Sequence, residues 1–326
     1  MRHTTLGSTG CSISRVALGT MTFGNQTPEA EAFEQLDRFV EVGGTLIDTA
    51  DAYSAGESER ILGRWLAARP GLHERVVVAT KARFPTGAGT NDLGLSRVHL
   101  ARALEGSLRR LGVETIDLYQ AHAFDPRTPR EETMRFLDDA VSGGKIHYSG
   151  LSNFTGWQVQ RAVDVAHYTA RSSPVALQAQ YNLLARDLEW EIVPAVEANG
   201  LGLLVWSPLA AGMLAGTRPL DEPGQDDHRA ARIRAVLEVL RSVAAVHDVS
   251  PARIALAWVA AQPAVSAVIL GARTMAQLED NLAALDIVLS TEELDRLTRV
   301  SEGVVDDYPY GSRGREQRLR KLEGGR

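Results

Sequence analysis

The strongest constraint on the fold is a repeated alternation of short apolar runs with longer amphipathic runs. Eight of the apolar runs have the length and the Val, Ile and Leu content of buried strands, and a segment with helical periodicity follows each. They cover residues 15–19, 45–50, 75–81, 115–122, 145–153, 174–181, 202–209 and 265–272. Apolar strands that alternate with helices are typical of a parallel sheet covered by helices. The pattern therefore predicts an α/β fold.

Closing eight such strands gives a (β/α)8 TIM barrel, a fold that a chain of 326 residues has ample length to form. The alternative is an open doubly wound sheet, which needs a glycine fingerprint after its first strand, and "ALGTMTFG" (17–24) does not supply it. Two β-prone runs around Gly7–Gly10 predict a β-hairpin ahead of the first strand. We expect a single barrel domain over 1–326, in which the polar segment 311–326 is a weakly ordered tail.

Several helix boundaries are also marked in the sequence. Ser96, Thr128 and Ser250 each precede a segment with helical periodicity, and a proline follows the last two directly. A serine or threonine hydroxyl can accept a hydrogen bond from a backbone N–H of the first turn. We therefore predict all three residues as helix N-caps.

The composition is that of an ordinary globular protein, with 44% hydrophobic and 23% charged residues. The net charge of −6 does not favour binding to nucleic acid or to a membrane surface. Cys11 is the single cysteine, which excludes an intramolecular disulfide and fits a reducing compartment. No secretory signal is visible, and no apolar run approaches the ~18 residues of a membrane span. We expect a cytoplasmic protein.

Ionisable residues gather where the predicted strands end. Asp48 ends the second strand and Tyr53 follows it in "LIDTADAY" (46–53), while Lys81 ends the third strand and His122 the fourth. Each has an ordinary explanation when it is taken alone, as a helix cap, a packing residue, a solvated loop residue or a structural histidine. In a barrel, however, the C-terminal strand ends meet at one mouth, where the chemistry takes place. We therefore expect all four to face one cavity.

These four groups suit proton transfer to a carbonyl oxygen. A phenol has a pKa near 10 and is a poor acid at neutral pH. A neighbouring ammonium lowers that pKa, and a carboxylate can hold the ammonium in place and charged. A neutral imidazole can orient a carbonyl oxygen by a hydrogen bond. A carbonyl that receives a hydride and this proton becomes an alcohol, and a cofactor has to supply the hydride.

At this point the chain closely resembles the aldo-keto reductase family. The resemblance runs from "LGSTGCSISRVALGTMTFG" (6–24) to "YPYG" (308–311), with several motifs in order at successive strand ends. They are "LIDTADAY", "ATK", "DLYQAH", "GLSNF", "LQAQYNLL", "WSPLAAGML" and "GARTMAQLEDNLAAL". The sequence is most similar to bacterial members related to the potassium-channel β-subunits. The resemblance places the catalytic tetrad on Asp48, Tyr53, Lys81 and His122, with Tyr53 as the general acid.

The resemblance also implies a nicotinamide cofactor lying across the barrel mouth. Ser152, Asn153 and Gln178 would hold its carboxamide, and Trp206 would stack on its ring. Asp48 is a further implied contact of the cofactor, together with Gly19, Thr20 and Met21 on and after the first strand. The implied contacts of the pyrophosphate are Ser207, Pro208, Leu209, Gly212 and Arg218. Those of the adenosine end are Gly271, Arg273, Gln277, Asp280 and Asn281.

Two departures from the family pattern bear on the cofactor. Relatives often place a lysine or arginine after the "SPL" motif to hold phosphate. In this chain the segment after "SPLAAG" is short and acidic in its middle, and Arg218 is the residue that it offers to the phosphates. Some relatives place Lys–Ser against a 2′-phosphate, where this chain has Gly271 and Ala272. Arg273 remains as the cation for that phosphate, although an arginine at this position can also be a plain surface residue. We expect NADPH as the cofactor and regard NADH as possible.

The predicted function is the reduction of an aldehyde or ketone, in a monomer or small homo-oligomer that uses neither a metal nor a nucleic-acid or membrane partner. Phe23, Phe84 and Phe124, with Tyr53 and His122, are the predicted walls of the substrate pocket, and the physiological carbonyl compound is left open. A nucleotide-sensing regulatory subunit with little turnover is the main alternative. A barrel lyase that forms a Schiff base on Lys81 is a weaker one. Metal-dependent hydrolysis is weaker still, because the sequence contains no H-E-x-x-H motif.

Overall fold

A computed structural model describes residues 1–216, 227–303 and 309–310, and within them eight parallel strands close into a barrel in the order β10-β3-β4-β5-β6-β7-β8-β9. The strands are β3 (Val16–Gly19), β4 (Leu46–Asp48), β5 (Val77–Ala82), β6 (Ile116–Ala121), β7 (Ile146–Ser152), β8 (Ala176–Gln180), β9 (Gly202–Trp206) and β10 (Val265–Gly271). Each predicted strand is present, so the (β/α)8 barrel is confirmed. The expected tail, 311–326, lies outside the described residues.

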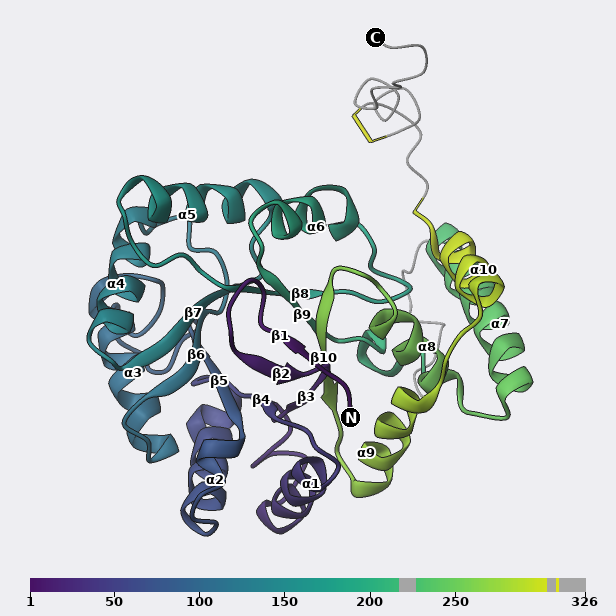
Figure 1. Ribbon diagram of the computed structural model, residues 1–326, viewed down its shortest axis with the longest axis horizontal. Helices are drawn as coiled ribbons and strands as arrows, with labels where there is room; N and C mark the ends of the chain where they lie inside the picture. The colour runs from purple at the N-terminus through teal and green to yellow at the C-terminus, as the bar shows by residue number, and fades with distance from the viewer. Residues whose placement is uncertain (217–226, 304–308, 311–326) are drawn as a thin grey trace.

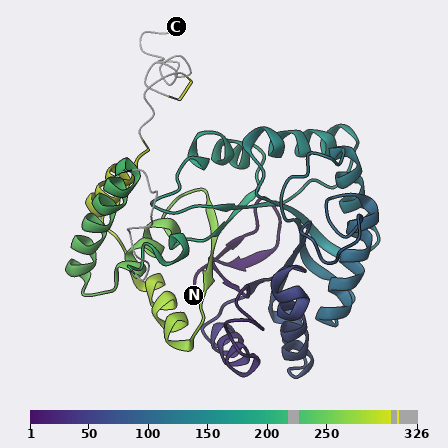
Figure 2. The same cartoon turned by 180° about the vertical axis from the view of Figure 1, so that it is seen from behind.

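Helices surround the barrel, as the two opposite views show (Figures 1 and 2). They are α1 (Glu29–Glu41), α2 (Glu57–Ala67), α3 (Arg97–Leu111), α4 (Arg130–Ser142), α5 (Gly156–Tyr168), α6 (Leu188–Ala198), α7 (Asp227–His247), α8 (Pro251–Ala260), α9 (Met275–Leu282) and α10 (Thr291–Ser301). In both views α7 and α10 lie side by side at one edge of the molecule. The ring of helices leaves the two ends of the barrel to the loops and the hairpin.

The predicted N-terminal hairpin is present and closes the end of the barrel where the strands begin. β1 (His3–Thr5) pairs antiparallel with β2 (Ser12–Ser14), and Figure 1 shows the pair lying across the centre of the ring. Leu6 and Ile13 are fully buried against residues inside the barrel, and the Ser8 N–H donates to Gly200 O at 2.8 Å. The opposite end, where the strands terminate, is left for the site.

Alternation along the strands decides which side chains enter the barrel. Leu46, Ala79, Leu118, Ala176 and Leu204 form a buried layer inside it, next to the hairpin. Successive side chains of a strand point to opposite faces, so residues two positions further along point inward again. Those residues are Asp48, Lys81, Gln120, Gln178 and Trp206. The polar residues therefore form the inner layer nearest the C-terminal mouth.

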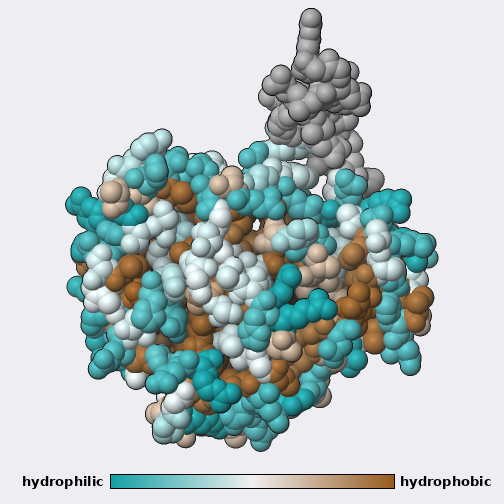
Figure 3. All heavy atoms as spheres, viewed as in Figure 1, coloured by the Kyte–Doolittle hydropathy of each residue, from teal (hydrophilic) through white to brown (hydrophobic). Residues whose placement is uncertain are grey.

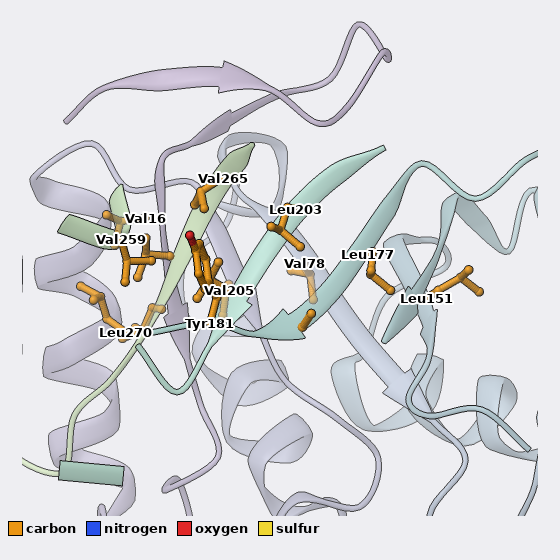
Figure 4. Packing of buried hydrophobic residues seen from close by; sticks show 14 of the residues in the cluster. Val16, Val78, Leu151, Leu177, Tyr181, Leu203, Val205, Val259, Val265 and Leu270 are labelled. Carbon is orange, nitrogen blue, oxygen red and sulfur yellow. The ribbon is translucent and has the colours of Figure 1, made fainter. Parts of the chain in front are cut away.

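The intervening strand residues point outward and pack under the helices. Val78, Leu177 and Val205 belong to the buried cluster that joins strands to helices, together with Val259 of α8 (Figure 4). Burial of each such side chain stabilises the fold by about 1.5–3 kcal/mol. The resulting rigid wall holds the inward-pointing polar residues in place.

Two of the three predicted helix caps are confirmed. The Ser96 and Ser250 hydroxyls accept hydrogen bonds from the backbone N–H groups of His99 and Arg253. The prediction for Thr128 is wrong, because α4 begins one residue later with Pro129 at the cap position. The Thr128 hydroxyl instead donates to Asp125 Oδ2 at 2.7 Å and stabilises the loop after β6.

The outer surface mixes polar and apolar residues. Figure 3 shows hydrophilic residues spread over this face, with apolar residues visible between them. Of the helices in the described parts of the chain, none combines the length and the apolar character needed to cross a bilayer.

Candidate active site

The four predicted catalytic residues come together at the C-terminal mouth of the barrel. Asp48 is the last residue of β4, and Tyr53 opens the short 3-10 helix η1 (Tyr53–Gly56) that follows. Lys81 lies near the end of β5, and His122 comes directly after β6. β4, β5 and β6 are adjacent in the barrel, so their ends bring the four side chains to one place.

Lys81 is the centre of this group and is fully buried (0% exposed). Its ammonium donates to Asp48 Oδ2 at 2.6 Å, to Thr49 O at 2.8 Å and to Tyr53 OH at 3.3 Å. An ammonium has three protons to donate, and each has an acceptor here. The network fixes the phenol oxygen beside a permanent positive charge.

Asp48 is fixed by two glutamines, Gln178 from β8 on the opposite side of the barrel and Gln120 from β6. Gln178 Nε2 donates to Asp48 Oδ1 at 2.8 Å, and Gln120 Nε2 lies 3.5 Å from the same oxygen. Gln120 was missed by the sequence analysis, although it stands two residues after Leu118 on β6 and is therefore an inward position. The carboxylate is held so that its other oxygen stays on Lys81.

The turn after Tyr53 has a constrained backbone. Ser54 and Ala55 have φ values of 49° and 52°, in the left-handed region that non-glycine residues seldom adopt. The Ser54 hydroxyl donates to Phe23 O at 2.8 Å and helps to hold this turn. Such conformations cluster at functional sites, and this one directs the Tyr53 ring toward Lys81.

The charges in this network set its protonation states. Burial raises the pKa of Tyr53 above its usual 10, and the Lys81 ammonium only partly offsets that effect. Burial opposes the charge on Lys81, but Asp48 and Tyr53 more than compensate and raise its pKa. The expected lowering of the phenol pKa by lysine is therefore present but is outweighed by burial. Tyr53 is protonated and Lys81 charged at neutral pH.

His122 is neutral in this environment. Burial, with the charges of Lys81 and Arg83, lowers the pKa of His122 to about 3. Its ring packs edge-on against Tyr53, with centroids 5.9 Å apart, and against Phe84 at 4.6 Å. A neutral imidazole keeps one N–H to donate and adds no positive charge.

Of the three phenylalanines predicted to line the substrate pocket, two are partly exposed and one is fully buried. Phe84 contacts His122 at the mouth, and Phe124 lies in the loop after β6 with its ring 5.5 Å from that of Phe154. Phe23 is fully buried in the core between strands and helices. We therefore keep Phe84 and Phe124, and not Phe23, as walls of the proposed pocket.

The residues expected at the carboxamide form a connected group beside the tetrad. Asn153 has a φ of 55° and donates from Nδ2 to His122 O at 2.9 Å and to Ser152 Oγ at 3.1 Å. Trp206 Nε1 donates to Asn153 Oδ1 at 3.1 Å. Gln178 stands on the other side of this group, bound to Asp48. These contacts hold the partly exposed indole at the mouth, next to the four residues predicted to be catalytic.

The loop after β9 follows directly from Trp206. Ser207, Ala210 and Ala211 have φ values of 52°, 50° and 54°, so the chain turns tightly through Pro208 and Leu209. Gly212, whose φ is 90°, completes the turn. Arg218, the expected phosphate contact of this segment, lies outside the described residues.

The expected adenosine contacts surround the beginning of α9. Arg273 and Gln277 are exposed, and the Arg273 N–H donates to Gln277 Oε1 at 2.8 Å. Asn281 Nδ2 donates to Gly271 O at 3.2 Å, and the space where a Gly271 side chain would start is open. Asp280 is bound to Arg253 at 2.7 Å and to Ser250 at 2.9 Å, which commits both of its oxygens to α8.

Three further expected contacts lie on and after β3. A side chain at Gly19 would collide with Ile269, so only glycine fits there. The Thr20 hydroxyl is fully buried and bound to Asp48 O, whereas Met21 is 65% exposed. Met21 is therefore the side chain of this segment that a ligand in the mouth can reach.

Taken together, this edge of the mouth fits an extended dinucleotide. The Trp206 indole stands beside the predicted catalytic residues, and a tight turn follows it. Beyond the turn lies the Arg273 cation, with open space around Gly271. Backbone N–H groups of tight turns and of helix N-termini are suited to phosphate oxygens. An extended ligand with a flat ring at one end and phosphates beyond it matches this order of features.

Comparison with known proteins agrees with the geometry. The chain is 39% identical to an uncharacterized oxidoreductase of Bacillus subtilis, YrpG, over 95% of this chain and 98% of that protein. It is 34% identical to a probable voltage-gated potassium channel subunit beta of Oryza sativa subsp. japonica, over 95% and 98%. It is 31% identical to versiconal hemiacetal acetate reductase of Aspergillus parasiticus, over 91% and 96%.

Fold, site and relatives define the chain as an NAD(P)H-dependent oxidoreductase that acts on carbonyl groups. It belongs to the aldo/keto reductase family, whose model matches residues 15–302.

Proposed function

We propose that this enzyme reduces an aldehyde or ketone to the alcohol, with NADPH as the source of hydride and Tyr53 as the proton donor. The observation that carries the proposal is the Lys81 ammonium, which is buried between the Asp48 carboxylate and the Tyr53 hydroxyl. This is an arrangement for a phenol that has to give up a proton at neutral pH. The reductase named among the relatives also supports it.

Each residue of the tetrad has a separate task in this proposal. Bound NADPH supplies the hydride for the carbonyl carbon. The Tyr53 hydroxyl donates its proton to the carbonyl oxygen, and Lys81 stabilises the phenolate that remains. Asp48 keeps Lys81 charged and in position. Neutral His122 donates a hydrogen bond to the same carbonyl oxygen and orients it.

The preference for NADPH depends on Arg273. It is exposed at the start of α9, and no hydrogen bond or ion pair of its guanidinium is found within the described residues. A guanidinium binds a phosphate in a bidentate manner, which suits the 2′-phosphate of NADPH. Ser152, Asn153 and Gln178 are the proposed contacts of the carboxamide, and Trp206 is the proposed stacking partner of the nicotinamide ring.

A panel of aromatic and aliphatic aldehydes and ketones tests the proposal. The purified protein is incubated with NADPH or NADH, and cofactor oxidation and alcohol formation are both measured. We expect one alcohol for each cofactor oxidised, and faster reaction with NADPH. Tight cofactor binding without any alcohol would contradict the proposal and favour a nucleotide-sensing regulatory subunit.

A further inference from the structure

Arg83 stands at the mouth of the site, in the loop that leaves β5. It follows Lys81 by two residues, and its Cζ atom lies over the Phe84 ring at 5.2 Å from the centroid. The same Phe84 ring packs edge-on against His122 at 4.6 Å. The guanidinium is therefore one aromatic ring away from the imidazole, close enough to contribute to the low pKa of His122.

The Arg83 guanidinium is left without a hydrogen-bond or ion-pair partner in the part of the chain that the structure describes. Its Nε atom is buried without a hydrogen-bond partner, and the described residues provide no ion pair for its guanidinium. The charge of Arg83 contributes to lowering the pKa of Asp125. The Asp125 oxygens, however, already accept hydrogen bonds from Leu95 N, Arg127 N and Thr128 Oγ1. The unpartnered Nε leaves the guanidinium poorly satisfied, and the terminal Nη atoms, which are not enclosed in this way, are the ones that an outside anion can reach.

Two other arginines near the surface, Arg110 and Arg64, are committed to carboxylates. Arg110 Nε donates to the buried Glu59 at 2.6 Å, and Arg64 binds Glu29 at 2.7 Å. Arg83 instead has an aromatic face as its main contact. Stacking on Phe84 leaves the two terminal Nη groups free to donate to a planar or tetrahedral anion.

The surface next to Arg83 is apolar and aromatic. Phe124 packs against Phe154 at 5.5 Å and against Trp157, which is 58% exposed, at 5.9 Å. Arg130 lies over the Trp157 ring at 5.3 Å, and its Nε atom likewise has no hydrogen-bond partner. The loops after β5 and β6, with the beginnings of α4 and α5, thus offer flat apolar contacts together with cations that lack acceptors.

We propose that Arg83 is a specificity-determining residue that binds an anionic group, a carboxylate or a phosphate, on the carbonyl substrate. The inference rests on the proposed carbonyl reduction and adds the class of substrate. The carbonyl oxygen lies at Tyr53 and His122, the body of the substrate lies along Phe84, and the anion reaches Arg83.

The test compares three aldehydes that share one ring. 4-Carboxybenzaldehyde carries a carboxylate, 4-formylphenyl phosphate carries a phosphate, and methyl 4-formylbenzoate is the neutral match. The kcat/KM of each is measured for the wild type, Arg83→Gln and Arg127→Gln. Arg127 is a matched control, because it is exposed in the loop after β6 and its side chain has no partner among the described residues.

We expect the wild type to prefer at least one anionic aldehyde over the ester. In Arg83→Gln, the ratio of kcat/KM for that anion to kcat/KM for the ester should fall roughly tenfold or more, mainly through KM. Arg127→Gln should keep the wild-type ratio. Arg83→Lys should recover part of it, because lysine retains the charge and loses the fork. The anionic aldehyde whose kcat/KM falls more in Arg83→Gln shows whether Arg83 prefers a carboxylate or a phosphate.

A ratio that stays the same in Arg83→Gln, or that falls equally in Arg127→Gln, would overturn the inference and leave carbonyl reduction intact. Failure of the wild type to reduce any of the three aldehydes, or any other carbonyl compound, would instead overturn the proposed function. If Arg83→Gln does not fold, the test is inhibition of the wild type by 4-(hydroxymethyl)benzoate and by its neutral methyl ester. Stronger inhibition by the anion is expected, and equal inhibition by the two compounds would contradict the inference.

Discussion

Lys81 Nζ lies 2.6 Å from Asp48 Oδ2, and both side chains are buried, with exposed fractions of 0% for Lys81 and 4% for Asp48. Removing one partner of a buried ion pair leaves an uncompensated charge, which typically costs about 3–5 kcal/mol. The pair is therefore expected to stabilise the fold, in addition to its proposed role in catalysis.

Asp48→Asn should lower both activity and stability. The neutral amide no longer holds the Lys81 ammonium charged beside Tyr53, so we expect kcat to fall by about 100-fold or more. The free energy of unfolding, measured by urea denaturation, should fall by about 3 kcal/mol. Glu41→Gln is the control, since Glu41 is 70% exposed in its pair with Arg38 and should change stability by less than about 1 kcal/mol. Equal effects of the two changes would refute this role of Asp48.

The pH dependence of carbonyl reduction should follow the phenol. Burial raises the pKa of Tyr53 above 10, so the donor stays protonated through the neutral range and is lost only as the pH rises beyond that value. His122, with its pKa lowered to about 3, stays neutral over the same range. We expect kcat to fall only at high pH, with no step at the ordinary imidazole pKa near 6.5. A step there that disappears in His122→Asn would contradict the account.

Asp51 should make stability depend on pH in the opposite sense from most carboxyl groups. It is 2% exposed, and burial together with the charge of Glu59 raises its pKa to about 7, against a smaller opposing effect of Arg110. The folded state therefore binds a proton that the unfolded state has lost. The resulting stabilisation is complete below about pH 4, near the unfolded pKa, and is lost as the pH rises through about 7.

Asp51→Asn removes this dependence. The free energy of unfolding of the variant, relative to wild type, should increase by a few kcal/mol between about pH 5 and pH 8. Urea midpoints at the two pH values measure it. Asp295→Asn, a change at an exposed position on α10, is the control and should show no such difference. A wild-type protein that gains stability against Asp51→Asn as the pH rises would show that this sign is wrong.

Arg273→Ala should separate the two cofactors. Loss of the guanidinium removes the proposed contact to the 2′-phosphate, so the Kd of NADPH should rise roughly tenfold or more while that of NADH changes little. Quenching of tryptophan fluorescence measures both, because Trp206 lies at the proposed nicotinamide site. Arg102→Ala, at an exposed position on α3, is the control. An equal rise in the Kd of NADPH and of NADH would show that Arg273 does not bind the 2′-phosphate.

The sequence contained enough information to predict the barrel and the place of the tetrad. Strand periodicity makes Asp48 and Lys81 inward positions, and the same rule reaches Gln120, which the motifs alone did not indicate. Thr128 was predicted as a cap because the sequence does not reveal that Asp125 takes its hydroxyl. Phe23 was predicted near the mouth because chain position does not reveal burial.

Other features depend on contacts between distant segments. The hydrogen bond from Trp206 to Asn153 joins residues on β9 and after β7, and no local pattern predicts it. Asp51 lies three residues after Asp48, yet packs toward Glu59 and Arg110 behind the site. Only the tertiary structure shows that the Asp48 carboxylate, and not that of Asp51, accepts a hydrogen bond from Lys81.

The most direct test of the central claim is the rate of hydride transfer in Tyr53→Phe, measured in a single turnover with bound NADPH and an aldehyde that the wild type reduces. Tyr148→Phe is the matched control, because Tyr148 is a partly buried tyrosine of β7, and β6 separates β7 from the strand that carries Lys81. We predict that Tyr53→Phe binds NADPH as the wild type does and transfers hydride at least about 100-fold more slowly, since it has no proton to donate. A Tyr53→Phe protein with the wild-type rate would contradict the assignment of Tyr53 as the proton donor.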